Sequence, residues 1–164
     1  MFNLKAFARL AIIVCITVAP VNANDLKSRT HTEDFVFVKY TLYDEAIKYL
    51  GLNERTNTRV IENLTDVNPR RTPWCAAFVN GILRNQGHAP NNSNVAYHFR
   101  KYGIGVTIPK EGDIVVFKNH VGIFVKFVNR NGKRYVAVLG GNQSNQVKVS
   151  YFRESRVVAY RRPG

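Results

Sequence analysis

The residues with the clearest chemical potential lie in the stretch TPWCAAFVNGILRNQG, residues 72–87. Thr72 suits a helix N-cap, Pro73 suits the first helical position, and Gly87 is typical of a helix end. Cys75 then lies in the first turn, where unpaired backbone N–H groups and the helix macrodipole stabilise negative charge. We therefore expect a lowered pKa for this thiol and a thiolate that attacks a carbonyl carbon, with the same N–H groups binding the oxyanion. The alternative is that Cys75 is a small buried residue of a core helix.

A nucleophilic thiol needs a general base, and the chain offers four histidines. They are His31, His88, His98 and His120. His120 follows the turn FKN and begins an apolar stretch, HVGIFVKFV, that alternates as a strand does. A ring at that strand end can lean over the sheet edge toward a helix terminus, so His120 is the predicted base. The alternative is a strand-end histidine without a partner.

A third residue should orient the imidazole through its second ring nitrogen. The stretch VLGGNQSNQ follows the next predicted strand, and its two glycines permit close backbone approach. Asn142 is the predicted orienting amide, with Gln143 as the second choice and a plain turn role for Asn142 as the alternative. Trp74, Gly141 and Gln143 are the predicted substrate-binding residues.

The spacing of apolar residues changes along the chain, from helical spacing in the first part to strand alternation in the second, and so predicts the elements that position these residues. Helical spacing predicts helices over residues 43–51, 57–65, 72–87 and 94–103. Alternation predicts strands over residues 112–117, 120–128, 133–140, 147–152 and 156–162, with a further short strand at 34–40. Helices first and an antiparallel sheet after them indicate an α+β domain.

Four stretches together resemble the cell-wall cysteine peptidases and amidases of the NlpC/P60 and CHAP superfamily. They are TPWCAAFVNGIL, PKEGDIVVFKNHVGIFV, YVAVLGGNQSNQVKVSYF and RVVAYRRP. The resemblance covers roughly residues 41–163 and implies a papain-like fold, with Cys75 as nucleophile, His120 as base and Asn142 as third residue. In CHAP-type members an acidic residue precedes the third position, whereas here Asn142 follows two glycines. NlpC/P60 members often use a second histidine, and this chain has none after His120.

Residues 1–23 have the composition of a secretory signal peptide. MFNLKAFARL carries two basic residues and no acidic one, AIIVCITVAP is a short apolar run, and VNA offers small residues at the cleavage spacing. We expect cleavage after Ala23, an N-terminal extension over residues 24–40, a catalytic domain over 41–163, and a location in the periplasm or outside the cell. An uncleaved N-terminal anchor is the alternative.

The net charge and the number of cysteines limit the kinds of partner and cofactor that we expect. The formal net charge is +13, and removal of residues 1–23 would take away two basic residues and no acidic one. A basic exported protein favours peptidoglycan and anionic cell-wall polymers as partners. Cleavage would leave Cys75 as the only thiol, and a lone cysteine with scattered histidines lacks the spacing of a zinc site, so we expect no metal and no cofactor. No base-reading module is recognisable, which argues against nucleic acid as a partner.

The sequence therefore predicts an exported, cysteine-dependent amide hydrolase that cleaves peptidoglycan stem peptides or the muramoyl–alanine bond. One alternative is a catalytically silent domain of the same fold that binds the cell wall or a polyanion. Another is a secreted toxin that uses the same Cys-His chemistry. The sequence does not choose among the amide bonds of the wall.

Overall fold

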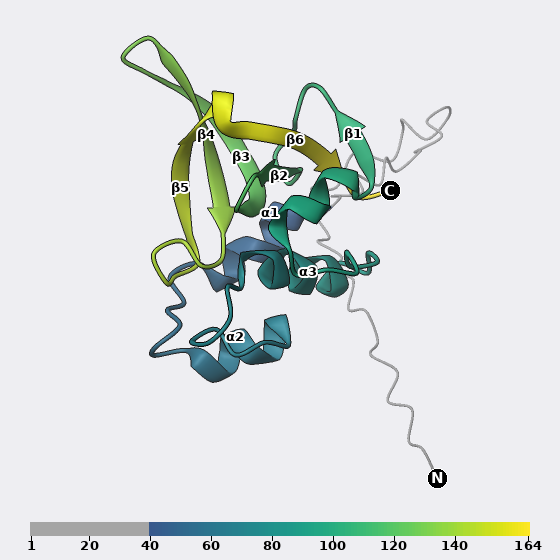
Figure 1. Cartoon of the computed structure of the whole chain (residues 1–164), viewed down its shortest axis with the longest axis vertical. Coiled ribbons are helices and arrows are strands. Elements are labelled where there is room, and N and C mark those ends of the chain that lie inside the picture. The colour runs from purple at the N-terminus through teal and green to yellow at the C-terminus, as the bar shows by residue number, and fades with distance from the viewer. Residues whose placement is uncertain (1–39) are drawn as a thin grey trace, which may run out of the picture. The chain divides into compact units, whose positions relative to one another are not determined.

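Helices come first and strands follow, which confirms the predicted α+β class (Figure 1). The computed structural model describes residues 40–164. The helices are α1 (Leu42–Ala46), η1 (Ile47–Tyr49), α2 (Thr58–Thr65), α3 (Cys75–Asn85), η2 (Ala96–Lys101) and η3 (Glu154–Arg156), where η marks a 3₁₀ helix. The strand predicted over 34–40 lies outside the described residues, except for Tyr40, which belongs to no element.

The six described strands form one antiparallel sheet in the order β1-β6-β2-β3-β4-β5. Their bounds are β1 (Ile104–Val106), β2 (Ile114–Phe117), β3 (Val121–Arg130), β4 (Lys133–Gly140), β5 (Lys148–Arg153) and β6 (Val157–Arg162). Strands β2 to β5 follow one another as hairpin neighbours, while β6 returns to lie between β1 and β2. Five of these strands match the sequence prediction, and β1 is an addition to it.

One face of the sheet packs against the helices, and α3 lies at the centre of that layer (Figure 1). Nine of the eleven residues of α3 are buried, in keeping with its run of small and apolar side chains. Ala76 and Ala77 are fully buried, and α3 contacts β3 and β4. Gly81 packs against Leu64 of α2, since a methyl group there would overlap the Leu64 carbonyl oxygen.

The sheet curls, so its other face encloses a second, smaller core. That core consists of Val115, Phe117, Phe124, Val136 and Val138. The rings of Phe117 on β2 and Phe152 on β5 have centroids 4.7 Å apart although two strands separate them in the sheet. Strong curvature of this kind brings the side chains of distant strands together.

A β-bulge in β3 changes the expected alternation. The register with β4 shifts between Phe124 and Lys126, so the side chain of Phe127 joins that of Phe124 in the second core. Val121, Ile123 and Val125 face the helices as the alternation predicted, whereas Phe127 does not. The extra residue of the bulge reverses the side-chain direction beyond it.

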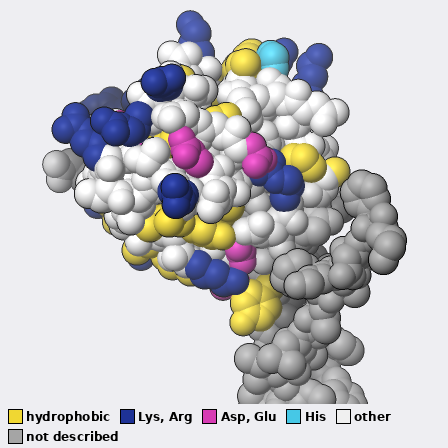
Figure 2. All heavy atoms as spheres, turned by 90° about the horizontal axis from the view of Figure 1, so that it is seen from below, with side chains coloured by type: hydrophobic (Ala, Val, Ile, Leu, Met, Phe, Trp, Pro, Cys, Tyr) yellow, Lys and Arg dark blue, Asp and Glu magenta, His cyan; other side chains and the backbone are white. Residues whose placement is uncertain are grey.

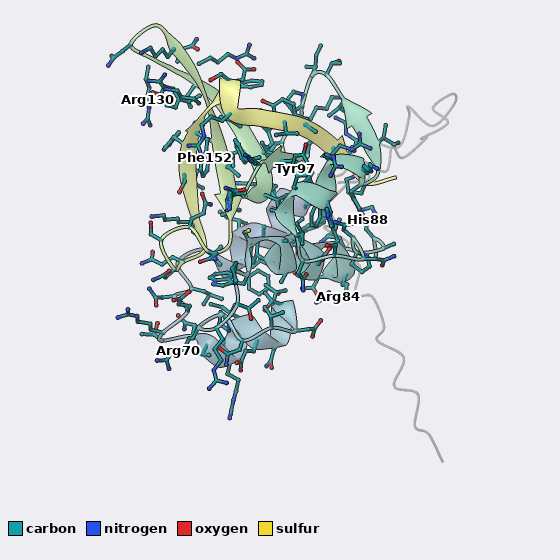
Figure 3. All side chains as sticks on the ribbon, viewed as in Figure 1. Arg70, Arg84, His88, Tyr97, Arg130 and Phe152 are labelled. Carbon is teal, nitrogen blue, oxygen red and sulfur yellow. The ribbon has the colours of Figure 1, made fainter. Side chains whose placement is uncertain are left out.

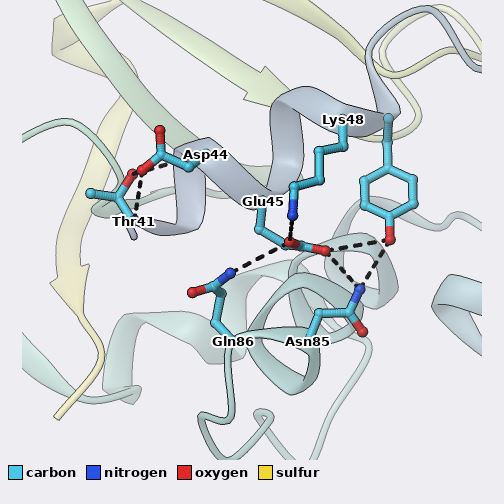
Figure 4. Close-up of polar contacts among 7 residues, drawn as sticks. Thr41, Asp44, Glu45, Lys48, Asn85 and Gln86 are labelled. Carbon is cyan, nitrogen blue, oxygen red and sulfur yellow. Dashed lines mark hydrogen bonds and ion pairs between the residues drawn. The ribbon is translucent and has the colours of Figure 1, made fainter. Parts of the chain in front are cut away.

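A polar network attaches the first helical segment to the end of α3 (Figure 4). Glu45 is buried, and its carboxylate accepts hydrogen bonds from Lys48 at 2.6 Å, Asn85 at 2.9 Å and Gln86 at 3.4 Å. These donors lower the pKa of Glu45 against the raising effect of its burial, which is the largest single influence. A buried carboxylate satisfied in this way fixes α1 and η1 on the domain.

The surface carries basic side chains on many elements, with acidic ones between them (Figure 2). Within the described residues, four ion pairs form: Lys48–Glu45, Arg84–Asp66, Arg134–Glu154 and Arg162–Asp113. No helix in residues 40–164 has the length and apolar character needed to cross a membrane.

Candidate active site

Cys75 is the first residue of α3, two positions nearer the helix start than the sequence indicated. The N-cap is Trp74, whose side chain makes no capping bond, and not the predicted Thr72. Thr72 lies in the preceding turn, where its backbone N–H donates to the Asn68 carbonyl oxygen at 3.0 Å. The local capping rule gave the wrong start because tertiary packing of Trp74 decides where the helix begins.

Trp74 and Gly141 hold the helix start against the end of β4. Trp74 is fully buried, and its indole N–H donates to Glu54 Oε2 at 3.2 Å. A methyl group on Gly141 would lie 2.4 Å from Trp74 Cζ3 and 2.7 Å from Phe78 Cβ, so only glycine permits this approach. Both residues therefore pack the core beside the site, which leaves neither of them facing a substrate.

The thiol of Cys75 is buried, with 7 % of the residue exposed. Burial raises its pKa above the ordinary value, and this influence outweighs hydrogen bonding from the backbone N–H groups of Val121, Ala76 and Cys75 itself, which lowers it. The predicted lowering of the thiol pKa is therefore wrong in sign. The N–H groups expected at the helix start are present, but removal of the sulfur from water dominates.

His120 immediately precedes β3, and aromatic rings enclose it. Its ring stacks on Phe117 with centroids 6.2 Å apart and lies 5.4 Å from the ring of Phe152. Burial lowers the pKa of His120 to about 4, with the positive charge of Arg156 adding to the effect. The imidazole is therefore neutral at pH 7.

Cys75 and His120 lie on neighbouring elements, because α3 contacts β3 and Val121, the first residue of β3, directly follows His120. The backbone N–H of Val121 is one of the groups that lower the pKa of the Cys75 thiol against its burial. The helix start and the histidine-bearing strand are thus adjacent, as the sequence predicted for this pair. A neutral thiol and a neutral imidazole in this arrangement can exchange a proton during attack on a carbonyl.

The side-chain amide of Gln143 is held in place through its nitrogen atom. Its Nε2 donates to the carbonyl oxygens of Val138 at 3.2 Å, Gly140 at 3.1 Å and Lys148 at 2.6 Å. This surround fixes the amide, because a flipped orientation would set Oε1 against three carbonyl oxygens. Gln143 Oε1 and His120 Nε2 are both buried without a hydrogen-bond partner in the described chain. A methyl group on Gly140 would lie 3.0 Å from Gln143 Nε2 and 3.3 Å from His120 Nε2, so the amide and the ring lie on the same side of that glycine.

Asn142 is placed differently from its neighbour. It is half-buried, it has a left-handed backbone with φ of 57°, and its side chain makes no hydrogen bond among residues 40–164. Asparagine tolerates this conformation better than most residues. The positive φ turns the chain so that the next side chain, that of Gln143, enters the protein.

Two hollows open on either side of His120 and Phe152. The first has a volume of about 310 Å³ and is lined, apart from these two rings, by Asn142, Gln143, Ser144 and Ser150. The second has a volume of about 410 Å³ and is lined, apart from them, by Phe117, Lys118, Asn119 and Arg156. Gln143 and Ser144 line the first hollow, whereas no residue of 88–108 lines either hollow.

Residues 67–142 match the family model of the CHAP domain. This part of the chain is thus similar to a CHAP domain. The match contains Cys75, His120 and Asn142, which confirms the resemblance drawn from sequence. No curated protein and no solved structure matches the chain. CHAP domains are typically hydrolases, peptidases or amidases that act on peptidoglycan.

The CHAP match ends before several residues that complete the site. Ser150, Phe152 and Arg156 lie beyond residue 142, and sequence reasoning missed all three together with Lys118. A signal for two of them was available. Ser150 and Phe152 are two apart on the strand paired with β4, so they share one face of the sheet.

Proposed function

We propose that the protein is an exported cysteine-dependent amide hydrolase that cleaves peptidoglycan stem peptides or the muramoyl–alanine bond. One observation carries the proposal: Cys75 begins the buried helix α3, which packs against β3, and His120 immediately precedes β3 and borders two open hollows. A cysteine that only packed the core would not require a neutral histidine next to a cleft, so the pairing favours a chemical role for Cys75.

In the proposed mechanism the resting site is neutral. His120 takes the thiol proton as the sulfur of Cys75 attacks the carbonyl carbon, and backbone N–H groups at the helix start stabilise the oxyanion. The imidazolium then gives its proton to the leaving amine. In the second step His120 activates water, which releases the acyl group and regenerates the thiol.

We further propose that Gln143, and not Asn142, orients the imidazole. The neutral ring that serves as base needs its proton on one nitrogen and a free lone pair on the other. His120 Nε2 and Gln143 Oε1 are both buried and unpartnered within residues 40–164, and both side chains border Gly140, so the proposed role requires the ring to turn its Nε2–H toward that oxygen during the reaction. Nδ1 is then left to receive the proton of Cys75. This role for Gln143 takes the place of the acidic residue that CHAP-type members carry before the third position.

The test uses the full chain and purified sacculi. The wild-type protein should release soluble peptide, and Cys75→Ala should reduce release to background while the near-UV circular dichroism is unchanged. His98→Gln is the matched control, because His98 is an exposed histidine whose side chain bonds only to Ser93 in the described structure. Full activity of Cys75→Ala would refute the mechanism.

Gln143→Glu and Gln143→Leu test the orienting role separately. Glutamate keeps an acceptor oxygen beside the ring but sets its other oxygen against the three backbone carbonyls that the amide nitrogen contacts, so kcat is compared per folded protein. On that basis glutamate should retain part of the activity, whereas leucine should lower kcat by about a hundredfold. Equal loss in the two variants would assign Gln143 a packing role only.

A silent wall-binding domain is the second candidate, and the raised pKa of Cys75 is the observation that favours it. A binder would retain sacculi without releasing product, and Cys75→Ala would bind as tightly as the wild type. Product release from sacculi, measured by mass spectrometry, separates the two candidates and identifies the bond that is cut.

A further inference from the structure

The two hollows beside His120 differ in charge. The first is lined by neutral polar side chains, whereas the second holds Lys118 and Arg156 and no acidic side chain among its lining residues. Lys118 comes from the turn between β2 and β3, and Arg156 comes from η3. Segments far apart in the chain therefore bring two positive charges to one side of the base.

These two cations, Lys118 and Arg156, form no ion pair in the part of the chain that the structure describes. The nearby Glu154 is paired with Arg134 at 3.4 Å. Arg156 lies over the ring of Phe152, with its guanidinium carbon 5.9 Å from the ring centroid. Both side chains are thus available to an anion that enters the hollow.

Unpaired positive charge at this place opposes the chemistry of the base. Arg156 disfavours a proton on His120, yet His120 must hold a proton after Cys75 has attacked. A negative group of the substrate between Arg156 and Lys118 would offset the repulsion between Arg156 and the protonated ring of His120, which forms when Cys75 attacks. The hollow therefore has the electrostatics of a site that operates with an anion bound.

We propose that the hollow lined by Lys118 and Arg156 binds a carboxylate of the substrate, so that the enzyme selects amide bonds close to a free carboxylate. The inference rests on the proposed function and names its substrate class as acidic peptides. A carboxylate fits better than a remote polyanion, because His120 itself lines the hollow, and the anion must belong to the molecule whose amide is cut. The planar guanidinium of arginine matches a carboxylate through two parallel hydrogen bonds.

Binding to an inactive variant tests the site without turnover. The full-length Cys75→Ala protein is titrated calorimetrically with acetyl-Ala-Glu-Lys carrying free carboxylates and with the same peptide carrying carboxamides. The acid should bind about tenfold more tightly, as one charge-assisted contact at a half-open site provides. Arg156→Gln on the same background should abolish this preference, and Lys118→Gln should reduce it.

Arg130→Gln is the matched control, because it removes the same charge from the β3–β4 hairpin. Arg130 stacks on Tyr151 at 3.9 Å and lines neither hollow, and it lies toward the hairpin end, away from Phe152 (Figure 3). The control should keep the full preference for the acid. Equal loss in Arg130→Gln and Arg156→Gln would overturn the proposal, because general surface charge would then explain the binding.

Four further outcomes decide the proposal. Equal binding of acid and amide overturns it, and so does inorganic phosphate that competes as strongly as the acidic peptide, since phosphate polymers would then be the better ligand. Equal hydrolysis of acid and amide by the wild type refutes the carboxylate site and leaves the proposed hydrolase standing. A preference for the acid in a protein that releases nothing from sacculi refutes the hydrolase and supports the carboxylate site.

Discussion

Replacement of His120 by glutamine should remove one pH-dependent part of the stability. The pKa of His120 is about 4 in the folded protein, against an ordinary 6.5. As the pH falls below 6.5, the unfolded chain binds this proton first, so the stability from the neutral ring is present above pH 6.5 and is lost toward pH 4. With these two values the loss is about 2 kcal/mol at pH 5 and about 3 kcal/mol at pH 4.

The measurement is urea unfolding of the wild type and His120→Gln at pH 7.5, 5.0 and 4.0. His120→Gln should lower the stability at pH 7.5, where only packing changes, and the difference between the two proteins should then shrink as the pH falls. Buried carboxylates such as Glu45 also weaken the fold in acid, but they do so equally in both proteins. His98→Gln removes an exposed imidazole and should reproduce the wild-type curve.

Parallel curves for the wild type and His120→Gln between pH 7.5 and 4.0 would refute the reasoning. The ring would then be solvated in the folded state, and the neutral resting pair of Cys75 and His120 would be wrong. Direct titration of the ring by nuclear magnetic resonance gives an independent reading, with a midpoint near pH 4 expected.

Three further predictions concern the packing around the site. Gly140→Ala should lower kcat about tenfold, because the added methyl group would lie 3.3 Å from His120 Nε2, and unchanged kcat in steady-state assays would count against the placement of the ring. Asp113→Asn should cost about 2 kcal/mol in urea unfolding, because both 2.7 Å bonds from Arg162 to a buried carboxylate lose their charged acceptor; a neutral result would show that water replaces them. Iodoacetamide should modify Cys75 more slowly at pH 7 than a free thiol of pKa about 8.5, followed by mass spectrometry, and a rate that is already maximal at pH 7 would mean that the thiol is ionised.

Sequence pattern predicted the elements whose residues alternate or repeat over several turns. Strands β2 to β6 and helices α2 and α3 follow this rule. Strand β1 was not predicted, because Ile104–Val106 is three residues long and mostly exposed and therefore shows no alternation of apolar and polar residues. Its place in the sheet comes from pairing with β6, a contact distant in the chain.

The site shows a similar division between local and distant effects. The positions of Cys75, of His120 and of the loop after β4 were predictable because each follows from residue type at an element end. The sign of the Cys75 pKa was not, since it depends on how completely the sheet covers the helix start. Whether the side chain of Asn142 or that of Gln143 turns into the protein depends on the left-handed backbone at Asn142. Asparagine tolerates this conformation but does not require it, so the sequence could not decide between the two residues.

The position of β6 also bears on how the chain is made. Its residues, Val157–Arg162, are made after the other described strands, yet they fill the gap between β1 and β2. At a synthesis rate of about 5–20 residues per second, β2 waits several seconds for this neighbour, with one side of its backbone unpaired. The sheet of the nascent chain therefore stays incomplete until β6 has been made, which leaves time for a chaperone to bind the unpaired strands.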